Sequence, residues 1–347
     1  HIVEALGKAA RDPKTHQYDE TGRGLPAFRN AVASWYRDRF GVELDPDREV
    51  LRLIGAKEGL AHLAWAVLNP GDIALVPDPA YPVYNVAAMF AGADAHRFPL
   101  TESAGYLPDL AAIPGDVLDR ARLMYLCYPN MPTGAVAGID FYADLVAFAR
   151  ERNILICLDM AYSELYYDGH KPHSMLEVEG AKDVAIEIHS LSKTYNMTGW
   201  RLGFAVGNVD ALDALEKLKS NVDSGAFLAI QEAGTAALSG SQDCVEGMRA
   251  IYQKRRDLLV DGLAGIGWNI PKPAATCYVW ATCPAGYTSA GLAETLLSDA
   301  GVLATPGSAY GQLGEGYVRF SLTVQGERQE ERIVEAVARI KEKVRLG

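Results

Sequence analysis

The architecture is indicated most clearly by Ile154-Leu155-Ile156-Cys157-Leu158-Asp159, five apolar residues in a row that end in an acid. A strand that is apolar at every position is buried on both faces, which is typical of parallel sheets covered by helices on each side. Five further stretches also read as strands, and several of them are apolar at consecutive positions: 51–54, 73–76, 123–128, 184–188 and 204–206. Together they predict a mostly parallel sheet.

Helical patterns separate these apolar runs. Apolar residues recur every three or four positions over 60–68 and again over 141–149, and Asn69-Pro70-Gly71 ends the first of these stretches. Strands that alternate with helices predict an α/β fold, in which helices sandwich the mostly parallel sheet.

The length of 347 residues predicts about two domains. Beyond residue 212 the pattern is mainly helical to about 263, and strands at 278–282 and 317–322 and an amphipathic closing helix follow. This end resembles a smaller α+β domain. Residues 1–40 are amphipathic without a sheet of their own, so we expect them to pack with it. The expected division is 1–40 for the N-terminal part of the small domain, 41–245 for the large domain and 246–347 for the C-terminal part of the small domain.

The charge and composition of the chain limit the kinds of binding partner that we expect. Lys and Arg number 33 and Asp and Glu 44, so the net charge is −11, which disfavours nucleic acid and anionic membrane surfaces. No apolar run approaches the roughly 18 residues of a membrane span. The five cysteines are scattered and form no CxxC pair, so we expect neither a metal site nor a disulfide framework. The chain starts at His1 without a signal-peptide pattern, and we expect a cytoplasmic location.

A lysine follows another apolar run, in Ser190-Leu191-Ser192-Lys193-Thr194-Tyr195-Asn196-Met197-Thr198-Gly199-Trp200-Arg201-Leu202-Gly203. A lysine just beyond a buried strand is open to desolvation, which lowers its pKa and frees the amine to form an imine with a carbonyl group. Ser190, Ser192 and Arg201 place hydroxyl and guanidinium donors around it, and such donors suit a phosphate. The segment therefore suggests a carbonyl cofactor that carries a phosphate.

Three more segments fit such a cofactor. Asp159 ends a buried strand, where an unpaired carboxylate is costly and where ligands bind in parallel sheets. A protonated pyridine nitrogen is a cation that offsets this cost. Gly55-Ala56-Lys57-Glu58-Gly59 lies between a strand and a helix, where backbone N–H groups hold phosphates. The turn Tyr128-Pro129-Asn130-Met131-Pro132-Thr133-Gly134 follows a further buried strand. The four segments together point to a pyridoxal-phosphate site.

In this order and spacing the segments closely resemble class I/II aminotransferases of the fold-type I pyridoxal-phosphate family, over essentially the whole chain. Three stretches resemble the LL-diaminopimelate aminotransferase branch: 53–60, 77–84 and 219–225. The resemblance implies transfer of an amino group from an amino acid, LL-diaminopimelate in particular, to a 2-oxo acid such as 2-oxoglutarate by a ping-pong mechanism. It also implies a homodimer that acts in amino-acid biosynthesis.

The resemblance assigns roles to matching residues. Lys193 would bind the cofactor carbonyl and move the substrate proton, Asp159 would pair with the ring nitrogen, and Tyr162 would donate to the ring oxygen. Tyr81 would stack on the ring. Arg319 would clamp the substrate α-carboxylate, and Tyr18 would reach the phosphate of the neighbouring subunit. The residues expected around the phosphate are Ala56, Lys57, Ser190, Ser192 and Arg201.

One position departs from the family pattern. The family motif is usually Asn-Pro-Thr-Gly, with the Asn touching the ring oxygen, but Met131 stands there and cannot donate that hydrogen bond. Either Tyr162 serves alone, or the side chain of Asn130 shifts to replace it. Two other activities remain open: an alanine- or aspartate-type aminotransferase, and a pyridoxal-phosphate C–S lyase that would share every cofactor residue. A non-catalytic effector-binding module would need a DNA-binding segment, and none is visible.

Overall fold

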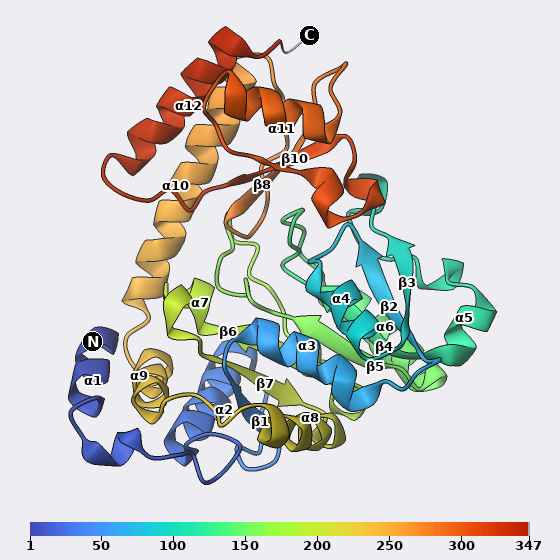
Figure 1. Cartoon of the computed structure of the whole chain (residues 1–347), viewed down its shortest axis with the longest axis vertical. Helices are drawn as coiled ribbons and strands as arrows, with labels where there is room; N and C mark the ends of the chain where they lie inside the picture. Colours follow the sequence, from blue (N-terminus) through green and yellow to red (C-terminus); the bar gives the residue numbers. More distant parts are fainter. Residues whose placement is uncertain (346–347) are drawn as a thin grey trace.

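The computed structural model describes residues 1–345 and confirms the α/β architecture (Figure 1). A seven-stranded sheet has the order β1-β7-β6-β5-β4-β2-β3. Its strands are β1 (Val50–Leu53), β2 (Ile73–Asp78), β3 (Asp94–Pro99), β4 (Ala121–Cys127), β5 (Leu155–Asp159), β6 (Ala185–Ser190) and β7 (Gly203–Gly207). From β3 through β6 every neighbouring pair is parallel, whereas β7 is antiparallel to both β6 and β1.

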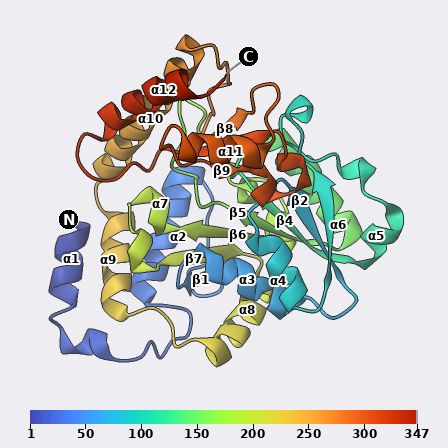
Figure 2. The same ribbon diagram turned by 45° about the horizontal axis from the view of Figure 1, so that its top comes forward.

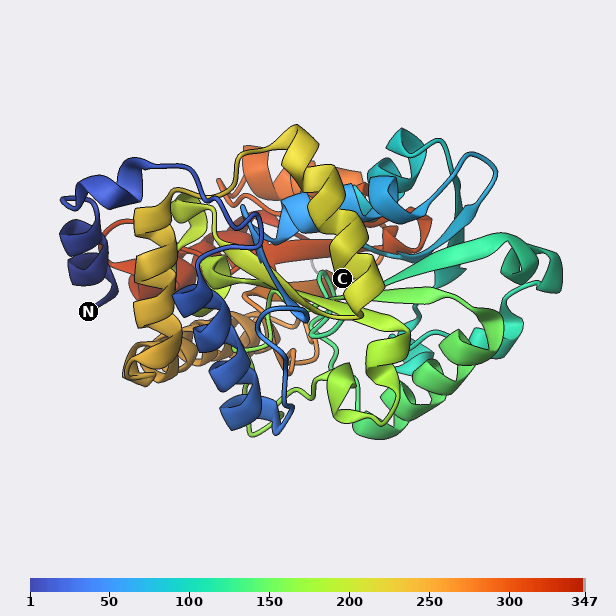
Figure 3. The ribbon, with the colours of Figure 1, turned by 90° about the horizontal axis from the view of Figure 1, so that it is seen from below.

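Both faces of this sheet are buried, as the consecutive apolar residues require. Along β4, Tyr125 belongs to one hydrophobic cluster while its neighbours Met124 and Leu126 belong to the other. The first cluster includes residues of α3 (Ala56–Val67), α4 (Val83–Phe90) and α8 (Val209–Val222). The second includes residues of α2 (Pro26–Phe40), α5 (Gly115–Arg120), α6 (Ile139–Arg152) and α9 (Leu228–Ser239). Figure 3 shows the sheet between these two layers.

A smaller unit lies at the C-terminal end of the chain (Figure 2). Its antiparallel sheet has the order β8-β10-β9, with β8 (Tyr278–Thr282), β9 (Thr305–Pro306) and β10 (Tyr317–Ser321). Three helices accompany it: α10 (Asp243–Gly265), α11 (Ser289–Ser298) and α12 (Gln329–Lys343). Ile333, Val337 and Ile340 are buried on one face of α12, which packs against α10.

The N-terminal helices pack mainly on α9 and on the large sheet, and the assignment of 1–40 to the small domain stays a prediction. Helix α1 (Ile2–Ala9) packs on α9, and α2 packs on α9 and β1. The ring centroids of Phe28 and Tyr36 in α2 lie 6.4 and 6.3 Å from that of Phe204 in β7. The apolar face of α2 therefore covers a sheet surface that would otherwise be exposed. The boundaries at 41 and 245 stay a prediction.

Within residues 1–345 no helix combines the length and hydropathy needed to cross a bilayer.

Candidate active site

The loop that carries Lys193 is built by the end of β6. Ser190 is the last residue of β6 and caps the short helix α7 (Leu191–Thr194), its hydroxyl accepting from Ser192 N at 3.2 Å. Lys193 is half-buried on α7 and lines an open cavity of about 510 Å³ between α7, α10 and the loop after β10. The hydroxyl of Ser192 is buried and has no hydrogen-bond partner among the described residues. A buried hydroxyl without a protein partner fits a hydrogen bond to a ligand oxygen.

The guanidinium of Arg201 lies against the start of α3. A Cβ atom at Gly55 would stand 2.2 Å from Arg201 Nη2, and Gly55 has a φ of 102°, so only glycine fits there. Gly203, the strand partner of Ser190, lies close to the backbone N–H of Ala56. The structure thus brings Ser190 and Arg201 to the N-terminus of a twelve-residue helix, where the free N–H groups and the helix dipole favour an anion.

Asp159 ends β5 and is 5% exposed. Its carboxylate accepts hydrogen bonds from the Tyr84 hydroxyl (2.8 Å) and from Ala161 N (3.1 Å). Burial raises the pKa of this carboxyl, and the Tyr84 hydrogen bond offsets part of that rise. No Lys or Arg of the described residues forms an ion pair with it, and His189 lies nearby on the neighbouring strand β6. The carboxylate is therefore placed to hold a cation of a bound ligand.

Aromatic residues line the space beside Asp159. Tyr162 is buried, and its ring lies 5.9 Å from that of Tyr278. Burial is the main cause that raises the pKa of the Tyr162 hydroxyl, which therefore stays protonated and able to donate. Tyr81 is half-buried, with its ring 6.0 Å from that of Tyr84 and 5.7 Å from the Lys57 ammonium.

Arg319 of β10 is held between two tyrosines. Its guanidinium carbon lies 3.8 Å from the ring centroid of Tyr278 and 4.8 Å from that of Tyr310. Its buried Nε has no partner among the described residues, and Nη1 has only the Met131 sulfur at 3.2 Å. The charges of Lys193 and Arg319 both act on the thiol of Cys277, whose pKa burial raises, so the three groups are neighbours. A planar cation with free donors beside an amine suits a carboxylate.

The polar side chains of the turn that follows β4 form hydrogen bonds within the turn itself. Asn130 is 1% exposed, its Nδ2 donates to Cys127 O at 3.2 Å, and its Oδ1 accepts from Thr133 N and from the Thr133 hydroxyl. These bonds favour the alternative in which Tyr162 acts alone over the one in which Asn130 shifts. Tyr18 stands apart: it is 77% exposed and lines a separate cavity with Asp19 and Arg52.

Sequence reasoning missed Tyr84, Tyr278 and Tyr310 as members of this site. Tyr84 follows Tyr81 by only three residues, across the turn that begins α4, where Tyr84 N donates to Tyr81 O at 3.3 Å; this short separation is visible in the sequence. Tyr278 is brought to Arg319 by the pairing of β8 with β10, and Tyr310 by a loop that docks on the large sheet. Neither neighbour can be read from local patterns.

The family model for aminotransferase class I and II matches residues 1–340 of the chain. A curated LL-diaminopimelate aminotransferase of Moorella thermoacetica is 53% identical over 96% of this chain and 85% of its own length. One from Syntrophobacter fumaroxidans is 55% identical over 96% and 86%. The solved structure of BacF from Bacillus subtilis without ligand has a TM-score of 0.95 at 43% identity, covering 99% of this chain and 90% of that one. A probable N-succinyldiaminopimelate aminotransferase of Thermus thermophilus reaches 0.91 at 37%, covering 99% and 90%.

Proposed function

The chain belongs to the class I and II aminotransferases, and from this premise we propose that it uses pyridoxal phosphate to move the amino group of LL-diaminopimelate to a 2-oxo acid. The observation that supports the transaminase chemistry is that Asp159 ends β5 and Lys193 follows the end of β6, its parallel neighbour, while Ser190 and Arg201 lie at the start of α3. The substrate rests on relatives 49–55% identical that bear the name LL-diaminopimelate aminotransferase. Similar solved structures bear several other names, so the fold alone does not set the substrate.

Each group of residues has one task in this proposal. Ser190, Ser192 and Arg201, with the N–H groups of Ala56 and Lys57 at the start of α3, hold the phosphate. Asp159 keeps a proton on the ring nitrogen, Tyr162 donates to the ring oxygen, and Tyr81 covers a ring face. The bound cofactor supplies the electron sink for the carbanion formed at the substrate Cα. Asn130 is proposed to lie beside the ring, and its side chain shapes the turn through its hydrogen bonds with Cys127 and Thr133.

Lys193 and Arg319 act on the amino acid. Arg319 binds the α-carboxylate bidentately, and the rings of Tyr278 and Tyr310 fix the plane of its guanidinium group. The Lys193 amine would remove the proton from the substrate Cα as a general base and, once protonated, would act as the general acid of the same half-reaction. The donor leaves as a 2-oxo acid before the acceptor (2-oxoglutarate in this proposal) enters, so ping-pong kinetics follow.

All five cysteines are free thiols, which supports a cytoplasmic location.

The substrate proposal predicts strong discrimination. We expect kcat/KM for LL-diaminopimelate to exceed the values for alanine and for aspartate by at least about 10²-fold, because a site that hydrogen-bonds the distal amino-acid group leaves polar groups unpaired when the ligand lacks it. A donor screen with 2-oxoglutarate as acceptor measures the ratio. Equal values for alanine would place the enzyme among the alanine-type aminotransferases.

The reaction type has its own control. With an amino acid and no acceptor, a transaminase converts one donor per site and stops, whereas a C–S lyase continues to release ammonia. Counting the 2-oxo acid formed per site therefore separates the two reactions. Continuous turnover would replace the transaminase proposal by the lyase.

We also propose a homodimer in which Tyr18 of each subunit donates to the phosphate in the other. The expected result is a dimer in sedimentation velocity at assay concentrations and about a tenfold weaker affinity for pyridoxal phosphate in Tyr18→Phe, the loss for one hydrogen bond to a charged group. Tyr18 is largely exposed, so this change removes no core contact. A fully active monomer would contradict the proposal.

A further inference from the structure

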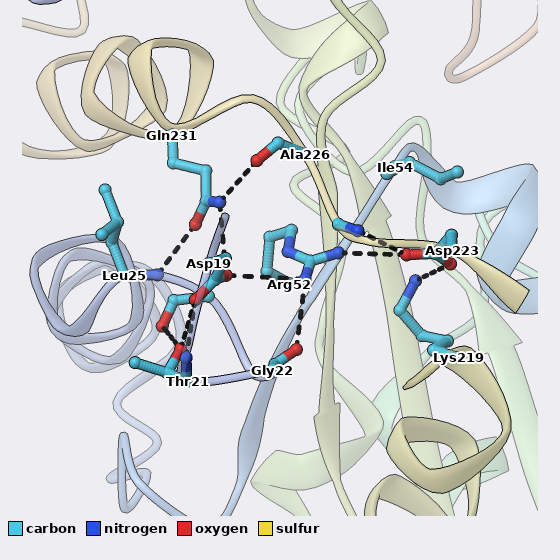
Figure 4. A network of polar contacts seen from close by, with 12 residues as sticks. Asp19, Thr21, Gly22, Leu25, Arg52, Ile54, Lys219, Asp223, Ala226 and Gln231 are labelled. Atoms are coloured by element: carbon cyan, nitrogen blue, oxygen red, sulfur yellow. Dashed lines mark hydrogen bonds and ion pairs between the residues drawn. The ribbon is translucent and has the colours of Figure 1, made fainter. Parts of the chain in front are cut away.

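Arg52 is a buried cation outside the site described above. It lies in the edge strand β1, and its side chain is 2% exposed. Its Nη2 donates to Gly22 O at 3.1 Å and lies 3.5 Å from Asp19 Oδ2, while Nη1 lies 3.8 Å from Asp223 Oδ1 (Figure 4). Nε and Nη1 make no hydrogen bond within the described residues. An arginine buried this deeply is stable only because carboxylates reach it from elsewhere in the chain.

Two surface segments meet on Arg52, and we call them the Tyr18 segment (18–25) and the 221–226 connection. Both fit closely around it: a Cβ atom at Gly24 would stand 2.5 Å from Arg52 Cβ, and one at Gly225 would stand 2.5 Å from Nη2. Gln231 of α9 joins the same two segments, because Leu25 N donates to its Oε1 at 2.8 Å and its Nε2 donates to Ala226 O at 2.9 Å (Figure 4). The two segments are thus fixed to one another through Arg52 and Gln231.

The charge network continues to the phosphate end of the candidate site. Asp223 also accepts from the Lys219 ammonium at 2.9 Å, and Lys219 lies 2.9 Å from Glu58 Oε1 in the first turn of α3. Glu58, His62 and Asp223 have the spacing of metal ligands. The Lys219 ammonium, however, supplies the positive charge between Glu58 and Asp223 and accounts for their closeness. We therefore assign no cation to this cluster.

Among the polar residues exposed on these segments (Glu20, Thr21, Asn221 and Ser224) stand two large apolar side chains, Tyr18 and Val222, with a third, Phe227, directly after the 221–226 connection. Tyr18 is 77% exposed, Val222 49% and Phe227 42%, and the Phe227 ring lies 5.5 Å from that of His16. Large apolar side chains that a charge network holds at the surface are suited to contact with another protein. In the proposed dimer that protein is a second copy of this chain.

We propose that Arg52 is a positioning residue for the shared cofactor site. It balances the charge of Asp19 and, together with Lys219, that of Asp223. In this way it holds the Tyr18 segment and the 221–226 connection in the arrangement with which one subunit completes the phosphate site of the other. This inference rests on the proposed function, in particular on the dimer and on the role of Tyr18. The Asp19 side chain is 1% exposed and keeps hydrogen bonds from Thr21 and Gln231, but without Arg52 its buried charge would lose its ion-pair partner. The Tyr18 segment would then move to hydrate it.

The test compares Arg52→Met with Arg256→Met. Arg256 is equally buried at 2% and pairs with Asp168 and Asp257, but none of its contacts involve the two segments. We expect Arg52→Met to weaken pyridoxal-phosphate binding at least about tenfold and to raise the dimer dissociation constant, with kcat at saturating cofactor unchanged. Arg256→Met should lower the melting temperature only. Absorbance titration and sedimentation give these quantities.

A rescue variant isolates the charge. Asp19→Asn in the Arg52→Met background removes the uncompensated carboxylate and should return cofactor affinity to within about threefold of wild type. If Arg52→Met does not fold, Arg52→Lys keeps the charge without the reach to both carboxylates and should weaken binding about threefold. Wild-type affinity in whichever of the two folds, or an equal loss in Arg256→Met, overturns the inference. A wild-type protein that neither dimerises nor binds pyridoxal phosphate would instead overturn the proposed function.

Discussion

Replacing Lys193 by alanine is expected to lower kcat by at least about 10⁴-fold while leaving the fold intact. The amine is both the attachment point for the cofactor and the group that moves the proton at Cα, and general acid–base catalysis alone contributes up to about 10⁴. It stands on α7, directly after β6, where its charge and that of Arg319 both reach the Cys277 thiol. Single-turnover absorbance measurements of the variant loaded with cofactor give the size of the effect.

Three further experiments test whether the effect is specific to the Lys193 amine. Lys217→Ala changes an exposed lysine of α8 and should leave the rate unchanged. Borohydride treatment of the wild-type protein should fix the cofactor on the peptide that contains Lys193, as mass spectrometry detects. A reduced adduct on another lysine, or on none, would contradict the assignment of Lys193. A small primary amine added to Lys193→Ala should restore part of the rate, because it supplies the missing base.

The sequence predicted those parts of the molecule whose environment is encoded locally. Strand β5 was predicted because its apolar run requires burial on both faces, and Lys193 and Asp159 were selected because each follows such a strand. Strand β3 was missed, since Asp94, His96 and Arg97 interrupt any apolar pattern. It pairs only with β2 at the edge of the sheet, where half of its backbone and most of its side chains meet solvent.

The remaining differences arise from contacts between distant segments. An amphipathic pattern shows that α2 has an apolar face, but not that this face covers β7. Arg52 interrupts the apolar strand Val50–Leu53 and would read as a solvated residue. It can be buried because two carboxylates from distant parts of the chain lie beside it. Asp19 comes more than thirty residues before it, and Asp223 more than a hundred after it. Charge pairing of this kind is set by tertiary structure and leaves no local signal.

Asp159→Asn is expected to cost about 3 kcal/mol of transition-state stabilisation, which lowers the single-turnover rate about 10²-fold, while cofactor stays bound. The amide has the size of the carboxylate and keeps an acceptor for the Tyr84 hydroxyl or for Ala161 N, so packing at the end of β5 is preserved. What it lacks is the charge that holds a proton on the ring nitrogen. The residues proposed to bind the phosphate, Ser192 and Arg201 among them, are unchanged in this variant and retain the cofactor.

Tyr84→Phe provides the graded comparison for this last prediction. It removes one hydrogen bond from the Asp159 carboxylate and leaves the charge, so the rate should fall by no more than about tenfold, the value of one such bond. The order wild type, Tyr84→Phe, Asp159→Asn in falling rate is what an electrostatic role requires. Burial raises the pKa of Asp159, because the charged form is poorly solvated there, and a cation of a bound ligand would stabilise that form. If Asp159 had only a structural role, the two variants would have similar rates. A near wild-type single-turnover rate in Asp159→Asn would show that the ring nitrogen does not depend on this carboxylate.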